Sequence, residues 1–190
     1  MIYLASLSPR RCELLKQINV AYQQIAVDVV ETPYPNELAQ EYVRRIALSK
    51  ARTGHLLVPK NQPVFGADTT VVCDGQLFGK PVDADDAKKM LKRLSGRAHQ
   101  VMTAVALVTT TIERVDLSIT KVYLQELTES DIQAYVASGE PLDKAGSYAI
   151  QGLASVFIER IEGSYSGVMG LPLHETAVLL AEIGIKIFNG

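Results

Sequence analysis

Two long apolar segments lie next to each other near the middle of the chain and constrain its fold more than any other feature. Residues 101–109 and 112–123 are rich in valine, isoleucine and threonine, and only a tight polar turn separates them. Runs of β-branched residues with so short a connection predict two neighbouring strands. Other predicted strands alternate with helices, so we expect a mixed α/β sheet rather than a purely parallel, doubly wound one.

Local signals place the remaining helices and strands. Apolar residues recur at three- and four-residue spacing from Ala39 to Ala51, which predicts a long amphipathic helix. Asp74-Gly75 predicts a hairpin turn after residues 64–73, whose apolar, β-branched composition is interrupted by Gly66 and Asp68. Further strands are expected at 2–5, 22–28 and 155–162, and further helices after Ser8, Asp83 and Thr128 and at 172–182.

The composition indicates a globular protein. The chain has 190 residues, of which 47% are hydrophobic and 21% charged, and its net charge is −2. This charge argues against broad nucleic-acid binding, so a few local cations would have to hold an anionic ligand. Two cysteines without metal-type spacing favour a reducing compartment. We therefore expect a cytoplasmic protein with a single domain, 1–190, no membrane segment and no nucleic-acid partner.

Common catalytic motifs are absent from the sequence. The patterns G-x-x-x-x-G-K-[ST], G-x-G-x-x-G, G-x-S-x-G and H-E-x-x-H do not occur. His55, His99 and His174 lie far apart without metal-ligand spacing, so we interpret each as a surface or packing residue. These observations disfavour P-loop, serine hydrolase and zinc hydrolase chemistry.

Two arginines occupy an unusual place at the start of a predicted helix. If Ser8 is the N-cap and Pro9 the first helical residue, Arg10 and Arg11 stand at the second and third positions. Cations there oppose the helix dipole, whereas a phosphate would be attracted by the dipole, the free N–H groups and the guanidinium groups. The alternative is that both arginines face solvent or pair with nearby carboxylates.

Asp68 is expected to end an apolar strand, after the small residues Gly66 and Ala67, which leave room for a ligand. A carboxylate in that position is costly unless it is paired or binds a metal. Triphosphate hydrolysis needs such a group to hold a hard divalent cation and to orient or deprotonate water. The alternative is a structural aspartate that caps the following turn.

Four further charged positions accompany Asp68. Glu31 lies in a proline-rich segment beyond a predicted strand and could reach the same cation, or could be a solvated loop residue. Lys50 is on the apolar side of its helix, where it either meets a partner or extends to solvent. Lys80 is constrained between Gly79 and Pro81. We interpret Asp143-Lys144 as a structural salt bridge.

An ordered set of motifs, spread from one end of the chain to the other, resembles the Maf family of nucleoside triphosphate pyrophosphatases. The matching segments are Leu4-Ala5-Ser6-Leu7-Ser8-Pro9-Arg10-Arg11, Glu31-Thr32-Pro33, Leu48-Ser49-Lys50-Ala51, Gly66-Ala67-Asp68-Thr69, Gly79-Lys80-Pro81, Leu94-Ser95-Gly96, Asp143-Lys144-Ala145-Gly146, Ile150-Gln151-Gly152 and Val168-Met169-Gly170-Leu171-Pro172-Leu173.

The resemblance implies a fold and a reaction. The fold would be like that of inosine triphosphate pyrophosphatases: an elongated mixed sheet flanked by helices, with two lobes around a central cleft. The reaction would be cleavage of a nucleoside triphosphate substrate between its α and β phosphates, giving the monophosphate and pyrophosphate. The resemblance also implies a divalent metal cofactor (Mg²⁺, Mn²⁺ or Co²⁺) and a homodimer.

Residue roles follow from the same resemblance. Asp68 would be the general base and a metal ligand, and Glu31 would help to hold the metal. The residues implied to contact the triphosphate are Ser8, Arg11, Lys50 and Lys80, the two lysines with a catalytic part.

Nucleotide preference within the family varies at three positions, which are Arg10, Thr69 and Gln151 in this sequence. This set is similar to that of the subgroup acting on dTTP and UTP. Glutamine and threonine offer donors and acceptors suited to a neutral pyrimidine, whereas a cationic methylated purine favours aromatic stacking. Modified pyrimidine nucleotides are an alternative substrate class, and a regulator of septum formation or cell division acting through a protein partner is an alternative function.

Overall fold

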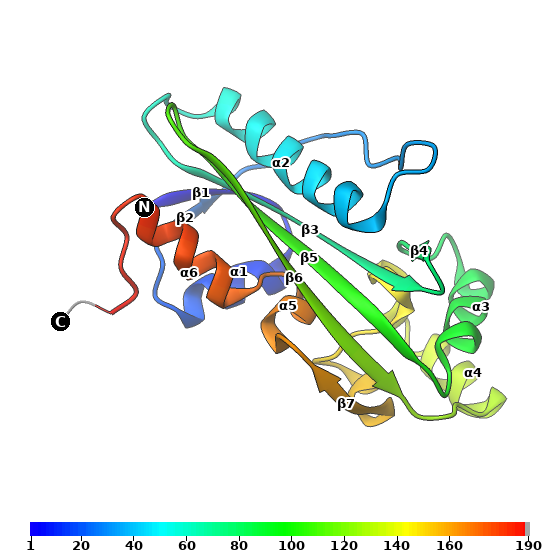
Figure 1. The fold of residues 1–190 in the computed structure, drawn as a ribbon. Helices are drawn as coiled ribbons and strands as arrows, with labels where there is room; N and C mark the ends of the chain where they lie inside the picture. Colours follow the sequence, from blue (N-terminus) through cyan, green and yellow to red (C-terminus); the bar gives the residue numbers. More distant parts are fainter. Residues whose placement is uncertain (189–190) are drawn as a thin grey trace.

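One seven-stranded mixed sheet organises the computed structural model, which describes residues 1–188 (Figure 1). Its strands are β1 (Ile2–Ala5), β2 (Tyr22–Gln24), β3 (Val64–Cys73), β4 (Gln76–Phe78), β5 (Ala98–Val108), β6 (Glu113–Leu124) and β7 (Ile158–Glu162). They follow the order β2-β1-β3-β5-β6-β7, with β4 paired to β3. β1 is parallel to β2 and β3, and the remaining pairs are antiparallel. The expected mixed sheet with flanking helices is confirmed.

Helices connect the strands and cover both faces of the sheet (Figure 1). They are α1 (Pro9–Gln17), α2 (Ala39–Leu57), α3 (Ala84–Leu94), α4 (Glu129–Ala137), α5 (Tyr165–Met169) and α6 (Leu173–Glu182), with the 3-10 helices η1 (Glu140–Asp143), η2 (Ala145–Ser147) and η3 (Leu153–Phe157). Asp83 caps α3, and Thr128 forms a capping box with Asp131 at the start of α4. Within residues 1–188, no helix is both long and apolar enough to cross a membrane.

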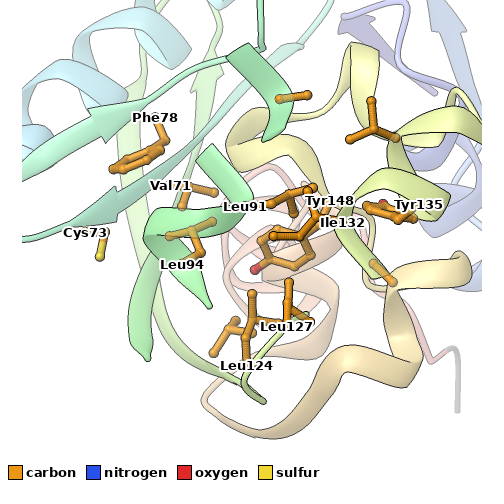
Figure 2. Packing of buried hydrophobic residues seen from close by; sticks show 14 of the residues in the cluster. Val71, Cys73, Phe78, Leu91, Leu94, Leu124, Leu127, Ile132, Tyr135 and Tyr148 are labelled. Carbon is orange, nitrogen blue, oxygen red and sulfur yellow. The ribbon is translucent and has the colours of Figure 1, made fainter. Parts of the chain in front are cut away.

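The two faces of the sheet bury different sets of side chains, because successive residues of a strand point to opposite sides. On one face, Val72 and Met102 belong to an apolar cluster with residues of α2. The other face carries two clusters. Phe65 packs with residues of α1 and α6, while Val71 packs with residues of α3 and α4 (Figure 2). The long strands β3, β5 and β6 thus carry a group of helices at each end, and Asp68 lies midway along β3.

Three expectations about strands are corrected. β2 ends at Gln24 rather than at residue 28, because its neighbour β1 pairs with it only through Leu4. β7 begins at Ile158, and the preceding residues form η3 instead. Asp68 does not end a strand, because β5 pairs with β3 continuously from Val64 to Val72. Residues 189 and 190 of the expected domain, 1–190, lie outside the described residues.

His99 is the buried member of the three histidines, and its environment predicts a pH-dependent stability. Its Nε2 lies 2.7 Å from the Tyr148 hydroxyl, and burial lowers its pKa from 6.5 to about 4. The unfolded chain therefore takes up a proton at His99 between pH 6.5 and about 4 while the folded chain does not. Stability should be fully present above pH 6.5 and fall by about 3 kcal/mol as the pH decreases through that window.

Urea unfolding at pH 7 and pH 4.5 measures this loss, and His99→Phe is the matched variant. The phenylalanine ring keeps the apolar shape but does not titrate, so the stability of the variant should decrease less between the two pH values. Other titrating groups act equally in both proteins. Equal pH dependence in the two proteins would contradict the assignment to His99.

Candidate functional site

The edge of β3 is open at residues 67–70, between two neighbouring strands. β1 pairs with β3 as far as Gly66, and β4 pairs with it only from Val71 onward. We call residues 67–70 the open edge. Because β1 is parallel to β3 and α1 follows it, the carboxyl end of β1 and the N-terminus of α1 lie at this edge. Ligands of α/β sheets commonly bind beyond the carboxyl ends of strands at such a change of neighbour.

Lys50 joins two carboxylates beside the open edge. Its ammonium nitrogen lies 2.8 Å from Asp68 Oδ1 and 2.7 Å from Glu31 Oε1. The side chains of Lys50 and Asp68 are 13% and 9% exposed, whereas that of Glu31 is 52% exposed. Lys50 therefore has partners and does not extend freely to solvent, and the two carboxylates converge on one point.

A close approach of α2 to β3 places Lys50 there. A Cβ atom on Gly66 would lie 2.3 Å from the Ala47 carbonyl oxygen and 2.6 Å from the Ala51 nitrogen. Only glycine leaves room for the helix backbone at this distance. Lys50, one residue before Ala51, is thereby brought next to the strand that carries Asp68.

The segment that carries Glu31 is irregular but is tied to α2. The Tyr42 hydroxyl donates to the Glu31 carbonyl oxygen at 3.0 Å. Arg45 donates to the Thr32 carbonyl at 3.1 Å and forms an ion pair with Glu37 at 2.5 Å. The helix therefore positions both Lys50 and, through this segment, the Glu31 carboxylate.

Burial sets the protonation behaviour of the cluster. Asp68 is 6% exposed, and burial raises the pKa of its carboxyl, although Lys50 and then Arg11 favour the charged form. Burial, together with the charges of Asp68 and Glu31, raises the pKa of Tyr42 to about 12. A buried carboxylate with a raised pKa is a better proton acceptor than one in water.

Arg11 lies on the opposite side of β3 and is held by the protein itself. Its Nε donates to the Gly170 carbonyl at 2.8 Å, one terminal nitrogen to Ser6 Oγ at 2.9 Å, and the other to Thr69 Oγ1 at 3.3 Å. Thr103 Oγ1 lies 3.0 Å from Thr69 Oγ1 and 2.7 Å from the Gly167 carbonyl. Burial lowers the pKa of Arg11, and the charge of Asp68 opposes this. Two of its five donors remain for an anion.

Within residues 1–188, the other expected site residues form no side-chain hydrogen bond or ion pair with these two groups. Ser8 holds the N-cap position of α1 but makes no side-chain cap hydrogen bond. The pKa of Asp143 is lowered first by its hydrogen bond to Lys144 and further by the charge of Arg10. The expected Asp143–Lys144 ion pair is present. Lys80 is exposed just after β4, where the chain returns toward the open edge, and Gln151 is exposed just before η3.

Comparison with known proteins shows the family to which the chain belongs. The family model described as "Maf-like protein" matches residues 1–183. The chain belongs to the Maf family. Among its relatives, the "dTTP/UTP pyrophosphatase" of Chromobacterium violaceum is 51% identical over 190 residues, covering 98% of this chain and 96% of that protein. The protein of the same name from Escherichia coli K12 is 51% identical over 180 residues, covering 95% and 91%.

One solved structure that is similar to this Maf-family chain is that of the Staphylococcus aureus Ham1 protein. The two chains are 15% identical, the match covers 82% of this chain and 90% of that one, and the TM-score is 0.49.

Sequence reasoning missed several residues that position the site. Thr103 is a polar residue inside an apolar strand, and that contrast was an available signal. Tyr42 fits the apolar period of the helix from Ala39 to Ala51, and this pattern carries no signal for its hydrogen bond to Glu31. Gly170 is 159 residues from Arg11, and local sequence carries no signal for such a contact.

Proposed function

We propose that this chain hydrolyses dTTP and UTP to the nucleoside monophosphate and pyrophosphate with the help of a divalent cation. The observation that carries the proposal is the convergence of Glu31 and Asp68 on the Lys50 ammonium, at 2.7 and 2.8 Å, beside the open edge of a buried sheet. Relatives about half identical over nearly their whole length carry the name dTTP/UTP pyrophosphatase. Modified pyrimidine nucleotides remain within the same substrate class.

The donor set fits a hard cation. Two carboxylates that share one ammonium can also share a divalent ion, since their oxygens already approach a common point. Within residues 1–188 there is no cluster of three or more histidine, cysteine, aspartate or glutamate side chains suited to a metal. Glu31 and Asp68 would therefore hold Mg²⁺, Mn²⁺ or Co²⁺ together with water and phosphate oxygens, as is common for Mg²⁺. When bound, the ion would neutralise phosphate charge.

The protein's own side chains accept the proton and stabilise the negative charge. Asp68 accepts a proton from water, and the water oxygen attacks the α phosphorus. The bond between that phosphorus and the bridging oxygen breaks, and pyrophosphate leaves with the electron pair. Lys50, Lys80 and Arg11 offset the negative charge of the triphosphate, and the N-terminus of α1 beyond Ser8 adds its dipole.

Base selection is assigned to Arg10, Thr69 and Gln151. A glutamine amide can both donate to and accept from a neutral pyrimidine, and the Arg10 guanidinium offers further donors. The Thr69 hydroxyl is engaged by Arg11 at 3.3 Å and by Thr103 at 3.0 Å, so Thr69 acts in part by orienting Arg11.

Three broader features accompany the proposal. Residues 1–190 act as one domain, because the same strands run through the clusters at both ends of the sheet. The enzyme works in the cytoplasm, where its nucleotide substrates are found. It forms a homodimer, which gel filtration against standards would test.

A nucleotide screen tests the activity. With Mg²⁺, Mn²⁺ or Co²⁺ present, pyrophosphate release should be fastest with dTTP and UTP and slow with dCTP and GTP. Omission of the metal and addition of a chelator should remove activity, because two carboxylates and no phosphate-bound cation would repel the triphosphate. Release of inorganic phosphate in place of pyrophosphate, or undiminished activity with the chelator, would refute the proposal.

A further inference from the structure

The half-buried carboxylate of Glu140 holds the segment that carries Gln151. Glu140 Oε2 accepts from the Leu153 N–H at 2.9 Å, and Glu140 Oε1 accepts from the Ala154 N–H at 3.3 Å. The carboxylate is so close that a Cβ atom on Gly152 would lie 2.2 Å from Glu140 Oε2. The backbone directly after Gln151 is therefore held against Glu140.

Tyr135 extends the same connection to the other side of Gln151. Its hydroxyl donates to Glu140 Oε1 at 2.8 Å and accepts from the Ala149 N–H at 3.3 Å. The segment 149–153 is thus bonded before and after Gln151 to one tyrosine–glutamate pair. Gln151 itself is exposed.

Tyr135 is part of the hydrophobic core. Tyr135 is 4% exposed and belongs to the apolar cluster between α3, α4 and β3 (Figure 2). Its ring meets that of Phe157 edge-on, with centroids 5.6 Å apart. Burial acts to raise the pKa of Glu140, but the N–H groups of Leu153 and Ala154 and the Tyr135 hydroxyl outweigh it, so the pKa is lowered and the carboxylate stays charged.

We propose that Glu140 and Tyr135 are positioning residues for base recognition, which fix Gln151 at the point where it meets the pyrimidine. The proposal rests on the proposed function. Neither residue touches the carboxylate cluster or the triphosphate-binding cations. Their loss should therefore affect the choice of base more than the hydrolytic step.

The variants Glu140→Gln and Tyr135→Phe test this inference. In Glu140→Gln the amide nitrogen cannot accept from a backbone N–H, so one end of the segment is released at nearly constant side-chain volume. Tyr135→Phe releases the other end. The ratio of kcat/KM for dTTP to that for dCTP should fall about tenfold in each variant, mainly through a higher KM for dTTP. Both substitutions break the same set of hydrogen bonds. The dTTP/dCTP ratio of the double variant should therefore be little lower than that of the worse single variant.

The chain offers a matched control pair. The Tyr123 hydroxyl donates to Glu162 at 3.1 Å on the edge of the sheet, away from the Gln151 segment. Tyr123→Phe and Glu162→Gln make the same chemical changes and should leave the dTTP/dCTP ratio unchanged. Amide hydrogen exchange at Leu153 should become faster in Glu140→Gln and not in the controls.

Two results would overturn the inference while leaving the proposed function intact. One is an unchanged kcat/KM for both nucleotides in folded Glu140→Gln, and the other is an equal loss of kcat/KM for both, which indicates a purely structural role. If Glu140→Gln does not fold, Tyr135→Phe decides by the same ratio, because it keeps the carboxylate. If the wild-type enzyme showed no preference for dTTP, the proposed function would be refuted. The inference, which rests on that function, would then fail as well.

Discussion

Asp68→Asn should lower kcat for dTTP by about a thousandfold, the loss typical of removing a general base. The amide has the shape of the carboxylate but cannot accept a proton from water. It is also a weaker ligand for a divalent cation. The fold should persist, since a neutral amide avoids the cost of burying a charge at a residue only 6% exposed, and Lys50 keeps its ion pair with Glu31.

Steady-state kinetics at saturating dTTP and thermal unfolding separate the two effects. Asp85→Asn is the control, because Asp85 is an exposed carboxylate whose ion pair with Lys88 lies on the outer side of α3. It should keep the wild-type rate. The pH profile tests the same residue. Activity of the wild type should fall as the pH drops through the pKa of Asp68, which burial holds above the ordinary 3.8. A kcat of Asp68→Asn within threefold of wild type would exclude Asp68 as the base.

Gly66→Ala should be the most damaging change that introduces no polar or charged atom. The added methyl group would lie 2.3 Å from the Ala47 carbonyl oxygen, and the obstacle is helix backbone, which cannot turn aside as a side chain can. We expect a loss of about 3 kcal/mol in the free energy of unfolding. Because α2 must move away from β3, Lys50 should separate from Asp68, and kcat/KM should fall about a hundredfold.

Urea unfolding and kinetics of the same preparation measure both losses. Gly79→Ala serves as the stability control, since the described residues place no atom within 4 Å of its added Cβ. Stability and activity should fall together in Gly66→Ala. A variant that is destabilised but fully active would show that the spacing between α2 and β3 does not govern the site.

Much of the fold could be predicted because its signals are local. The helical period of α2, the Asp74-Gly75 turn and the caps at Asp83 and Thr128 each depend on residues a few positions apart, and the structure has all of them. The end of β2 could not be predicted, because residues 25–28 have the composition of a strand and only the shortness of β1 denies them a partner. Strand length is decided by the neighbour, which lies elsewhere in the sequence.

The site also has features that local sequence predicts and features that depend on distant packing. The charged residues Glu31, Lys50 and Asp68 stood out because each is unusual in its local setting, and the structure brings them together. That Lys50 pairs with both carboxylates, and that Arg11 is bonded to Ser6 and Gly170, depends on the packing of α2 and α5 and has no local signal. The roles assigned to these charged residues, and to Ser8, Arg10, Thr69, Lys80 and Gln151, remain predictions.

The strands β3, β5 and β6 pass without a break through the clusters at both ends of the sheet. The two ends of the sheet therefore cannot be exchanged or removed separately, because a cut between them would interrupt strands that both ends share. A change that alters the choice of nucleotide must therefore leave the packing at both ends of the sheet intact if the protein is to stay folded.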